Sequence, residues 1–255
     1  MRDLAYRLYA ARLRRGLRGR LLPRHVAVVM DGNRRWAREV GYADPRVGHR
    51  HGAEHVDDLL RWCAELDISH VTVYVCSVDN LRKRDSDEVL HLMRMIEEVV
   101  AERVRRTDSQ WRLHVAGRLD ALPESTRDAL KRAADETRDR TQFHLTIAIG
   151  YDGRAEIADA VRSLLDARAR AGETPARLAE SLTAEDIAAH LYTTGQPDPD
   201  LVIRTSGEQR LSGFLIWQAA HAELYFCDAY WPGFRHVDFL RALRAYGSRQ
   251  RRFGA

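Results

Sequence analysis

Residues 25–36 read HVAVVMDGNRRW, and this stretch decides the fold. Its first half, His25–Met30, is a continuous apolar run of the kind found in strands that are buried on both faces of a parallel sheet. Asp31 and Gly32 follow directly, and two arginines then begin what looks like the first turn of a helix. Free amides at a helix start bind phosphate oxygens, and a glycine lets the backbone approach them closely. The stretch therefore predicts a strand, a phosphate-binding turn and a helix.

Asp31 makes the chemistry of this turn more specific. A carboxylate repels a phosphate, so an aspartate among phosphate-binding groups indicates a divalent cation that bridges the two. We therefore interpret residues 31–36 as a site for a diphosphate and Mg²⁺. The turn alone leaves a second interpretation open, in which Asp31 only caps the helix that follows it.

A second segment indicates the same chemistry. The short apolar run Leu201–Ile203 is followed by RTSGEQRLS, residues 204–212. Arg204 and Arg210, together with two serines of this segment, can bind an anionic group through charge-assisted, forked hydrogen bonds. A solvated basic loop is the alternative interpretation. Two phosphate sites at strand ends indicate one substrate with several phosphates or two phosphorylated substrates.

The composition is that of a soluble globular protein. The chain has 255 residues, of which 45% are hydrophobic and 31% charged, and this length is most simply one domain. The net charge is +4, but basic and acidic residues are mixed along most of the chain, which suits acidic small molecules better than nucleic acid. The three cysteines are far apart, which indicates a reducing compartment and no structural zinc. We expect neither a membrane span nor a signal peptide, and therefore a cytoplasmic protein.

The N-terminal segment departs from this even mixture of charges. Residues 1–24 contain eight arginines and one aspartate, with leucines at positions 4, 8, 13, 17 and 21. A basic amphipathic helix of this kind can lie on an anionic membrane surface. It can also pack on its own domain with the arginines in water, which is the interpretation we favour. We therefore divide the chain into a basic N-terminal helix, residues 1–22, and a main domain, residues 23–255.

From residue 23 onward, strand-like runs alternate with helical periodicity. Apolar, β-rich runs occupy residues 25–30, 70–77, 111–116, 143–149, 201–204 and 224–226. Apolar residues at helical spacing fill residues 48–66, 87–106, 124–138, 152–171, 184–192 and 237–251, and residues 167–179 are expected to be a helix end and an exposed loop. The pattern predicts a single α/β domain with a central, mostly parallel six-stranded sheet flanked by helices. Ligands of such folds bind beyond the carboxyl ends of the strands, where both phosphate segments and residues 77–80 fall.

These segments together resemble the cis-prenyltransferases, the family of undecaprenyl diphosphate synthase. The resemblance extends from residue 23 to the end of the chain, and it rests on motifs in this order: residues 25–36, Gly48-His49, 77–81, 150–153, 200–212, Trp217, Glu223, Trp231-Pro232 and 251–254. It implies an Mg²⁺-dependent enzyme that condenses isopentenyl diphosphate with an allylic diphosphate, forms a Z double bond and releases diphosphate. It also implies a homodimer, in which Arg252 reaches a neighbouring site.

The resemblance assigns roles to individual residues of the catalytic domain. Asp31 holds Mg²⁺ and is essential, Glu223 is a second carboxylate for the metal, and Asn80 lies near the proton that leaves the condensing carbon. The allylic diphosphate is held by Gly32, Asn33, Arg34 and Arg35, and the diphosphate of isopentenyl diphosphate by Arg204, Arg210 and Ser212. The other expected substrate contacts are Trp36, Arg46, His49, Ser77, Val78, Asp79, Leu81, Leu211 and one of the cations Lys83 and Arg84.

Product length depends on an apolar product tunnel, because each added five-carbon unit has to be buried. We expect its wall to comprise the strand end Tyr74–Ser77 and the helix positions Leu90, Met93, Ile96, Val99 and Val100. Long-chain relatives often have alanine where this chain has Val75, which narrows the tunnel. This residue and the segments 196–200 and 206–213 resemble actinobacterial Z-farnesyl diphosphate synthases, so we predict a C15 product from geranyl diphosphate.

Two alternatives remain open at this point. The first is a long-chain synthase that makes C50–C55 products for cell-wall carrier lipid. The second is a non-catalytic partner subunit of a prenyltransferase, which would lack the aspartate or the phosphate-binding arginines. Asp31, Arg204 and Arg210 are all present, so the sequence favours an enzyme.

Overall fold

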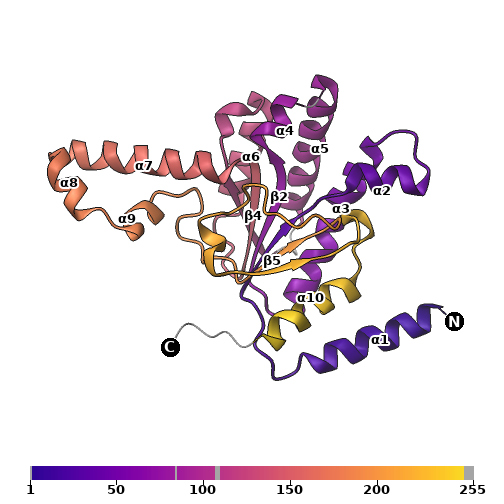
Figure 1. The fold of residues 1–255 in the computed structure, drawn as a ribbon. Coiled ribbons are helices and arrows are strands. Elements are labelled where there is room, and N and C mark those ends of the chain that lie inside the picture. The colour runs from indigo at the N-terminus through magenta and orange to yellow at the C-terminus, as the bar shows by residue number, and fades with distance from the viewer. Residues whose placement is uncertain (1, 84, 107–109, 250–255) are drawn as a thin grey trace.

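A six-stranded sheet forms the centre of the molecule in the computed structural model, which describes residues 2–83, 85–106 and 110–249 (Figure 1). The strand order is β3-β4-β2-β1-β5-β6, and all neighbouring strands are parallel. The strands are β1 (His25–Val29), β2 (His70–Ser77), β3 (Trp111–Ala116), β4 (Phe143–Tyr151), β5 (Leu201–Arg204) and β6 (Glu223–Phe226). The predicted α/β fold with a mostly parallel six-stranded sheet is confirmed.

Helices make most of the crossovers that parallel strands require. In chain order they are α1 (Arg2–Gly16), α2 (Asn33–Val40), α3 (Arg46–Ala64), α4 (Val78–Lys83), α5 (Ser86–Arg105), α6 (Glu124–Glu136), α7 (Gly153–Arg170), α8 (Pro175–Ser181), α9 (Ala184–Ala188) and α10 (His236–Ser248). Short 3₁₀ turns are η1 (Leu119–Ala121), η2 (Gln218–His221) and η3 (Trp231–Gly233).

Both faces of the sheet are buried, because alternate residues of a strand point to opposite faces. Val26 and Val28 of β1 join the larger apolar cluster, to which α3, α5, α6 and α10 contribute. Ala27 and Val29 join a smaller cluster, to which the segment of residues 205–222 contributes aromatic and aliphatic side chains. This segment therefore packs on the second face, and its first residues lie at the carboxyl ends of the strands.

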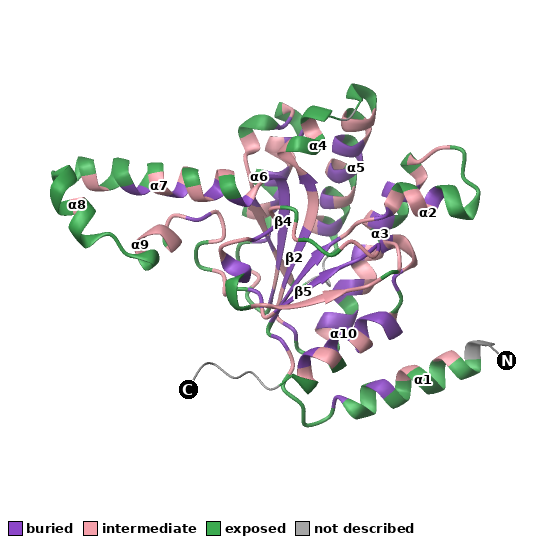
Figure 2. Cartoon of the chain, in the orientation of Figure 1, coloured by how far each residue is buried: buried purple, intermediate pink, exposed green. Residues whose placement is uncertain are grey.

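Helices α7, α8 and α9 form an arm that extends away from the sheet (Figure 1) and is largely exposed (Figure 2). The root of the arm is fixed by Glu156 of α7, which is fully buried. Its carboxylate accepts hydrogen bonds from the Gln218 side chain at 3.1 Å, from the Tyr192 backbone at 2.9 Å and from the Tyr151 hydroxyl. Burial raises the pKa of Glu156. These bonds tie the arm to β4 and to the loop that leads to β5.

Helix α1 packs along α10. Leu13 and Leu17 are buried in the larger cluster, and the Tyr9 hydroxyl accepts a hydrogen bond of 3.3 Å from Arg241. These contacts confirm that the basic helix packs on its own domain, while the division at residues 22 and 23 stays a prediction. Among the described helices, none has the length and apolar composition needed to cross a membrane.

The structure differs from the predicted elements at three places. Residues 167–179, expected to be a helix end and a loop, include the start of α8, because Thr174 caps the helix and Pro175 occupies its first turn. The helix expected at 184–192 ends at Ala188. Helix α4 was not expected as a separate helix, and it follows β2 without a break.

Candidate active site

The carboxyl ends of three neighbouring strands bring the predicted site residues together. Val29 of β1 pairs with Tyr74 of β2 on one side and with Arg204 of β5 on the other. Asp31 follows β1, and Ser77 ends β2. Segments far apart in the sequence therefore meet at one edge of the sheet, where ligands of open α/β folds bind.

Gly32 makes the turn from β1 into α2. Its φ of 97° lies in the left-handed region, and its amide donates a 2.7 Å hydrogen bond to Asp31 Oδ1. A Cβ at this position would lie 2.6 Å from Cδ1 of Tyr230, so only glycine fits. Helix α2 begins at the next residue, and the amides of its first turn point toward the site as the sequence predicts for an anion-binding helix start.

The Asp31 carboxylate lies between two guanidinium groups. Its Oδ2 accepts a 3.0 Å hydrogen bond from Arg204 Nη2, and its Oδ1 is 3.6 Å from Arg35 Nη2. Its backbone is fixed by Thr205, whose hydroxyl accepts from the Asp31 amide at 3.0 Å and donates to the Asp31 carbonyl at 2.8 Å. About a third of the carboxylate side chain is exposed (36%), so it can still reach a ligand.

Arg204 organises the loop that follows β5. Its guanidinium is buried and donates from Nη1 to Ser212 Oγ at 2.8 Å and to the Arg210 carbonyl oxygen. Its Nε is buried and has no hydrogen-bond partner among the described residues. The Arg210 side chain is exposed and pairs with Glu208. The loop thus presents one buried cation, Arg204, and one exposed cation, Arg210, to the site.

Arg35 connects the two phosphate segments. Its Nη2 donates to Ser206 Oγ at 2.8 Å, and its Nη1 is 3.6 Å from Glu208 Oε1. Its guanidinium also lies over the Tyr230 ring, 5.3 Å from the ring centre. Since Glu208 pairs with both Arg35 and Arg210, the cations of the site are held close together by carboxylates. An incoming diphosphate can replace these carboxylates as the counter-ion.

The donor set fits Mg²⁺ only if the substrate supplies ligands. No group of three or more His, Cys, Asp or Glu side chains that could hold a metal occurs in the described part of the chain. Mg²⁺ is often bound through one or two carboxylates, waters and substrate phosphates rather than by an all-protein cage. Asp31, partly exposed beside the cations that would bind phosphate, matches that pattern.

Glu223 does not lie beside Asp31 within one chain, so its expected role as a second carboxylate for the metal stays a prediction. Glu223 begins β6 and pairs with Leu201, at the opposite end of the strands from Asp31. Leu201 is level with Val26, so five residues of strand, about 16 Å, separate the two carboxylates along the sheet. Glu223 instead forms an ion pair with Arg249.

Helix α4 carries the residues expected near the transferred proton. The Ser77 hydroxyl accepts a 2.9 Å hydrogen bond from the Asn80 amide, which fixes the start of the helix. Asn80 is exposed, and Asp79 and Lys83 pair with each other at 2.6 Å. Val78 is half-buried and Leu81 packs against the larger cluster. Arg84 lies outside the described residues.

Arg34 and His49 converge on one carboxylate. Nε2 of the buried His49 is 3.4 Å from Glu88 Oε1, and Arg34 Nη1 is 3.7 Å from Glu88 Oε2.

Arg46 pairs with Asp44 on the surface at 2.8 Å. Trp36 packs against the rings of Tyr42 and His51, and Leu211 is half-buried in the smaller cluster. Arg34 and His49, in contrast, lie where α2, α3 and α5 meet.

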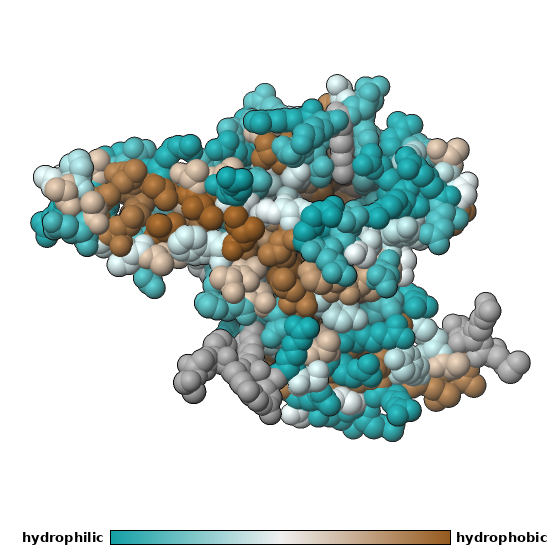
Figure 3. Space-filling model, in the orientation of Figure 1, coloured by the Kyte–Doolittle hydropathy of each residue, from teal (hydrophilic) through white to brown (hydrophobic). Residues whose placement is uncertain are grey.

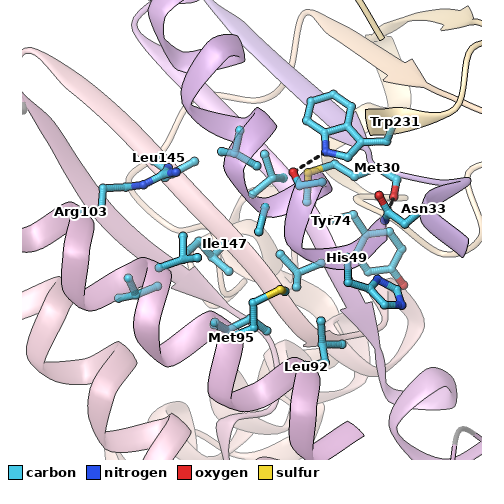
Figure 4. A pocket seen from close by; sticks show the side chains of 18 residues that line it. Met30, Asn33, His49, Tyr74, Leu92, Met95, Arg103, Leu145, Ile147 and Trp231 are labelled. Atoms are coloured by element: carbon cyan, nitrogen blue, oxygen red, sulfur yellow. Dashed lines mark hydrogen bonds between the residues drawn. The ribbon is translucent and has the colours of Figure 1, made fainter. Parts of the chain in front are cut away.

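An apolar cavity of about 80 Å³ adjoins this meeting point (Figure 4). Its wall includes the predicted residues Val75, Ile96, Val99 and Val100, together with Asn33 and His49. Two other predicted wall residues are elsewhere, because Leu90 is exposed and Met93 is buried in the larger cluster without lining the cavity.

Several residues that contact the site were missing from the predicted set. They are Thr205, Glu208, Tyr230 and Glu88. Thr205 and Glu208 belong to the phosphate segment 204–212, so their position in the sequence was a usable signal. Tyr230 and Glu88 reach the site only through tertiary packing, which no local sequence pattern indicates.

Comparison with known proteins gives a consistent set of relatives. The family model described as "Putative undecaprenyl diphosphate synthase" matches residues 29–254. An "Isoprenyl transferase" of Streptomyces fradiae is 58% identical over 99% of this chain and 98% of its own length. A "(2Z,6E)-farnesyl diphosphate synthase" of Mycobacterium tuberculosis is 49% identical over 100% of this chain and 97% of its own length. The crystal structure of lavandulyl diphosphate synthase from Lavandula x intermedia, in complex with dimethylallyl diphosphate, matches with a TM-score of 0.85 and 32% identity over 92% of this chain and 99% of that chain.

The variant Gly32→Ala tests the turn, with Gly41→Ala as its matched control. Both glycines have similar positive φ values, 97° and 94°, but a Cβ at Gly41 would have nothing within 4 Å. Both variants should lose about 1 kcal/mol of unfolding free energy from the left-handed backbone, and Gly32→Ala should lose more than this because its Cβ would also clash with Tyr230. Only Gly32→Ala should also weaken binding of inorganic pyrophosphate, by about tenfold, since a lost charge-assisted hydrogen bond costs about 1.5–3 kcal/mol. Urea unfolding and calorimetry measure both effects, and equal pyrophosphate affinity in the two variants would contradict the assignment.

Proposed function

The chain belongs to the undecaprenyl diphosphate synthase family of isoprenyl transferases, and we propose that it condenses isopentenyl diphosphate with geranyl diphosphate. The product is then a short Z-prenyl diphosphate, (2Z,6E)-farnesyl diphosphate, and diphosphate is released. Short-chain cis-prenyl transfer agrees with the activity named for the mycobacterial relative. The observation that carries the proposal is the junction of a cationic strand edge with an apolar cavity.

The chemistry requires neutralisation of the charge that develops on the leaving diphosphate. In our proposal, Arg35 and the amides that start α2 hold the allylic diphosphate, and Arg204, Arg210 and Ser212 hold that of isopentenyl diphosphate. The two sets meet at Asp31, which contacts both Arg35 and Arg204. Both diphosphates would therefore lie beside the same carboxylate, which brings the two reacting carbons close together.

Asp31 would hold Mg²⁺, and the bound ion would supply further positive charge to the leaving group. Proton removal from the condensing carbon needs an acceptor at the end of β2. Asn80 is at this position, but an amide is a weak base. We propose that Asn80 orients the proton and that the released diphosphate can accept it.

The relatives favour the short product over the long-chain alternative, because the mycobacterial relative is named for the C15 product (2Z,6E)-farnesyl diphosphate. A non-catalytic subunit has no need of Asp31 or of the buried Arg204, and both are in place. The expected homodimer, the cytoplasmic location and the role of Arg252, which lies outside the described residues, stay predictions. Sedimentation velocity of the purified chain tests whether it is a homodimer.

We also propose that α1 contacts an anionic membrane surface. One face of α1 packs on α10, but Leu4 and Leu8 are exposed on the other. At 100° per residue, Arg15 lies on the same outer face as these leucines, with Arg7 and Arg12 on either side. None of these three arginines has an ion-pair partner among the described residues. Exposed leucines framed by unpaired arginines match a bilayer of acidic lipids.

Asp31→Asn tests the proposed enzyme. The change keeps the shape of the side chain and removes its charge, so turnover with isopentenyl diphosphate, geranyl diphosphate and Mg²⁺ should fall by about 10²–10³-fold or more. Asp139→Asn, at a 96% exposed carboxylate, is the matched control and should retain wild-type turnover. Circular dichroism checks that each variant is folded. Wild-type turnover of a folded Asp31→Asn protein would refute the metal assignment.

Val75→Ala tests the narrowing of the tunnel. Removing two methyl groups from the cavity wall should shift part of the product from C15 to C20 or longer, as sized by mass spectrometry. Val115→Ala is the matched control, because Val115 packs against the same cluster without lining this cavity. An unchanged product from active Val75→Ala would exclude this side chain as a determinant of length.

The membrane contact is tested by co-sedimentation with phosphatidylglycerol vesicles. Replacing Leu4 and Leu8 together by serine should lower binding by about a hundredfold or more, since each leucine contributes about 1.5–3 kcal/mol when fully buried. Leu165→Ser, at an exposed leucine of the arm, is the matched control and should bind like the wild type. Binding that is equally strong to neutral phosphatidylcholine vesicles, or equal in all three proteins, would contradict the proposal.

A further inference from the structure

The stripe of α5 side chains that lines the apolar cavity ends in a charge. The lining residues from this helix are Leu92, Met95, Ile96, Val99, Val100 and Arg103. Spacings of three and four residues place them on one face of the helix. Five of the six are apolar, and Arg103 is the one arginine or lysine among the described residues that line the cavity.

Arg103 lies at the end of the cavity remote from the diphosphate site. Figure 4 shows Arg103 beside Leu145 at one end and Asn33 and His49 at the other. The course of α5 agrees with this view. Glu88, which contacts His49, is in the first turn of α5, and Arg103 is in its last turn. A chain anchored by its diphosphate near α2 therefore grows toward Arg103.

The Arg103 guanidinium is buried, and contact with an alkyl chain would not stabilise it. The residue is 8% exposed, and its Nη2 lies 2.7 Å from Asp57 Oδ1 of α3. Despite this ion pair, Nη2 has no hydrogen-bond partner within the described residues. Burial lowers the pKa of Arg103, but an arginine side chain still keeps its charge. Hydrocarbon in contact with the cavity side of this group would desolvate the charge further and leave Asp57 as its compensation, which is unfavourable.

From this arrangement we infer that Arg103 is a specificity-determining residue that ends the product tunnel after three isoprene units. The inference rests on the proposed function. Leu92 and Arg103 are 11 residues apart, which is about 16 Å along the helix. With bonds of about 1.5 Å, a four-bond isoprene repeat extends about 5 Å and three repeats about 15 Å. A fourth unit would have to bury the guanidinium against hydrocarbon or move it away from Asp57.

Arg103→Met tests this role, because methionine keeps a long unbranched side chain without the charge. The full chain is incubated with isopentenyl diphosphate, geranyl diphosphate and Mg²⁺, and the products are sized by mass spectrometry. The ratio of C20 and longer products to C15 should rise by about tenfold or more. Arg103→Lys keeps a cation at the same place and should still give C15.

Arg106→Met is the matched control. Arg106 pairs with the same carboxylate, 3.4 Å from Asp57 Oδ2, but does not line the cavity, so its product should stay at C15. A C15 product from folded, active Arg103→Met overturns the inference, and so does lengthening in both variants. Failure of the proposed function would look different, because the wild type itself would then make no C15 product.

A measurement on the wild type covers the case in which Arg103→Met does not fold. Geranyl, farnesyl and geranylgeranyl diphosphate are titrated without isopentenyl diphosphate, and binding is followed by calorimetry. Affinity should hold or rise from C10 to C15 and fall by about tenfold at C20, where the chain end meets the guanidinium. Equal or tighter binding of the C20 ligand would overturn the inference.

Discussion

A buried guanidinium at the end of one strand requires a counter-charge at the end of the neighbouring strand, and the arrangement of the site depends on this requirement. Arg204 ends β5 and is almost fully buried, and Asp31 follows the adjacent β1. Removing Asp31 would leave the buried Arg204 charge with less compensation, which is destabilising. In the proposed function, a diphosphate bound to Arg204 would provide this compensation from outside. The oxygens of Asp31 would then be available to a cation, so that anion and cation binding would support each other.

Two glycines of α3 hold the polar edge and the apolar cavity in a fixed relation. A Cβ at Gly48 would lie 2.1 Å from the Asn33 carbonyl oxygen, and one at Gly52 would lie 2.4 Å from Asn33 Oδ1. The start of α2 therefore rests directly on α3, with no side chain between them. Since α3 also forms part of the cavity wall, the start of α2, which we propose binds a diphosphate, is held in a fixed position relative to the cavity. The Trp231 indole reinforces this contact with a 2.7 Å hydrogen bond to the Gly52 carbonyl.

The sequence predicts the strands and the polar edge well for a physical reason. Strands buried on both faces must be continuously apolar, so β2, β3 and β5 have the predicted bounds. Parallel order then places the polar residues after β1 and β5 on one edge. Glu223 shows the limit of such inference, because a motif fixes residue order but not the end of the sheet where a residue lies. Leu90 shows another limit, since one helix position decides between cavity wall and solvent.

The width and the length of the cavity depend on different parts of the fold. Val75 is on β2, which β1 and β4 hold from both sides, so the wall at this point can change only through the side chain itself. Arg103 is on α5, whose register against the sheet is set by apolar packing and by the ion pair with Asp57. In our proposal, the Val75 side chain limits how much chain the cavity can hold, and the Arg103 charge limits how far that chain can extend. The short product would therefore depend on both side chains.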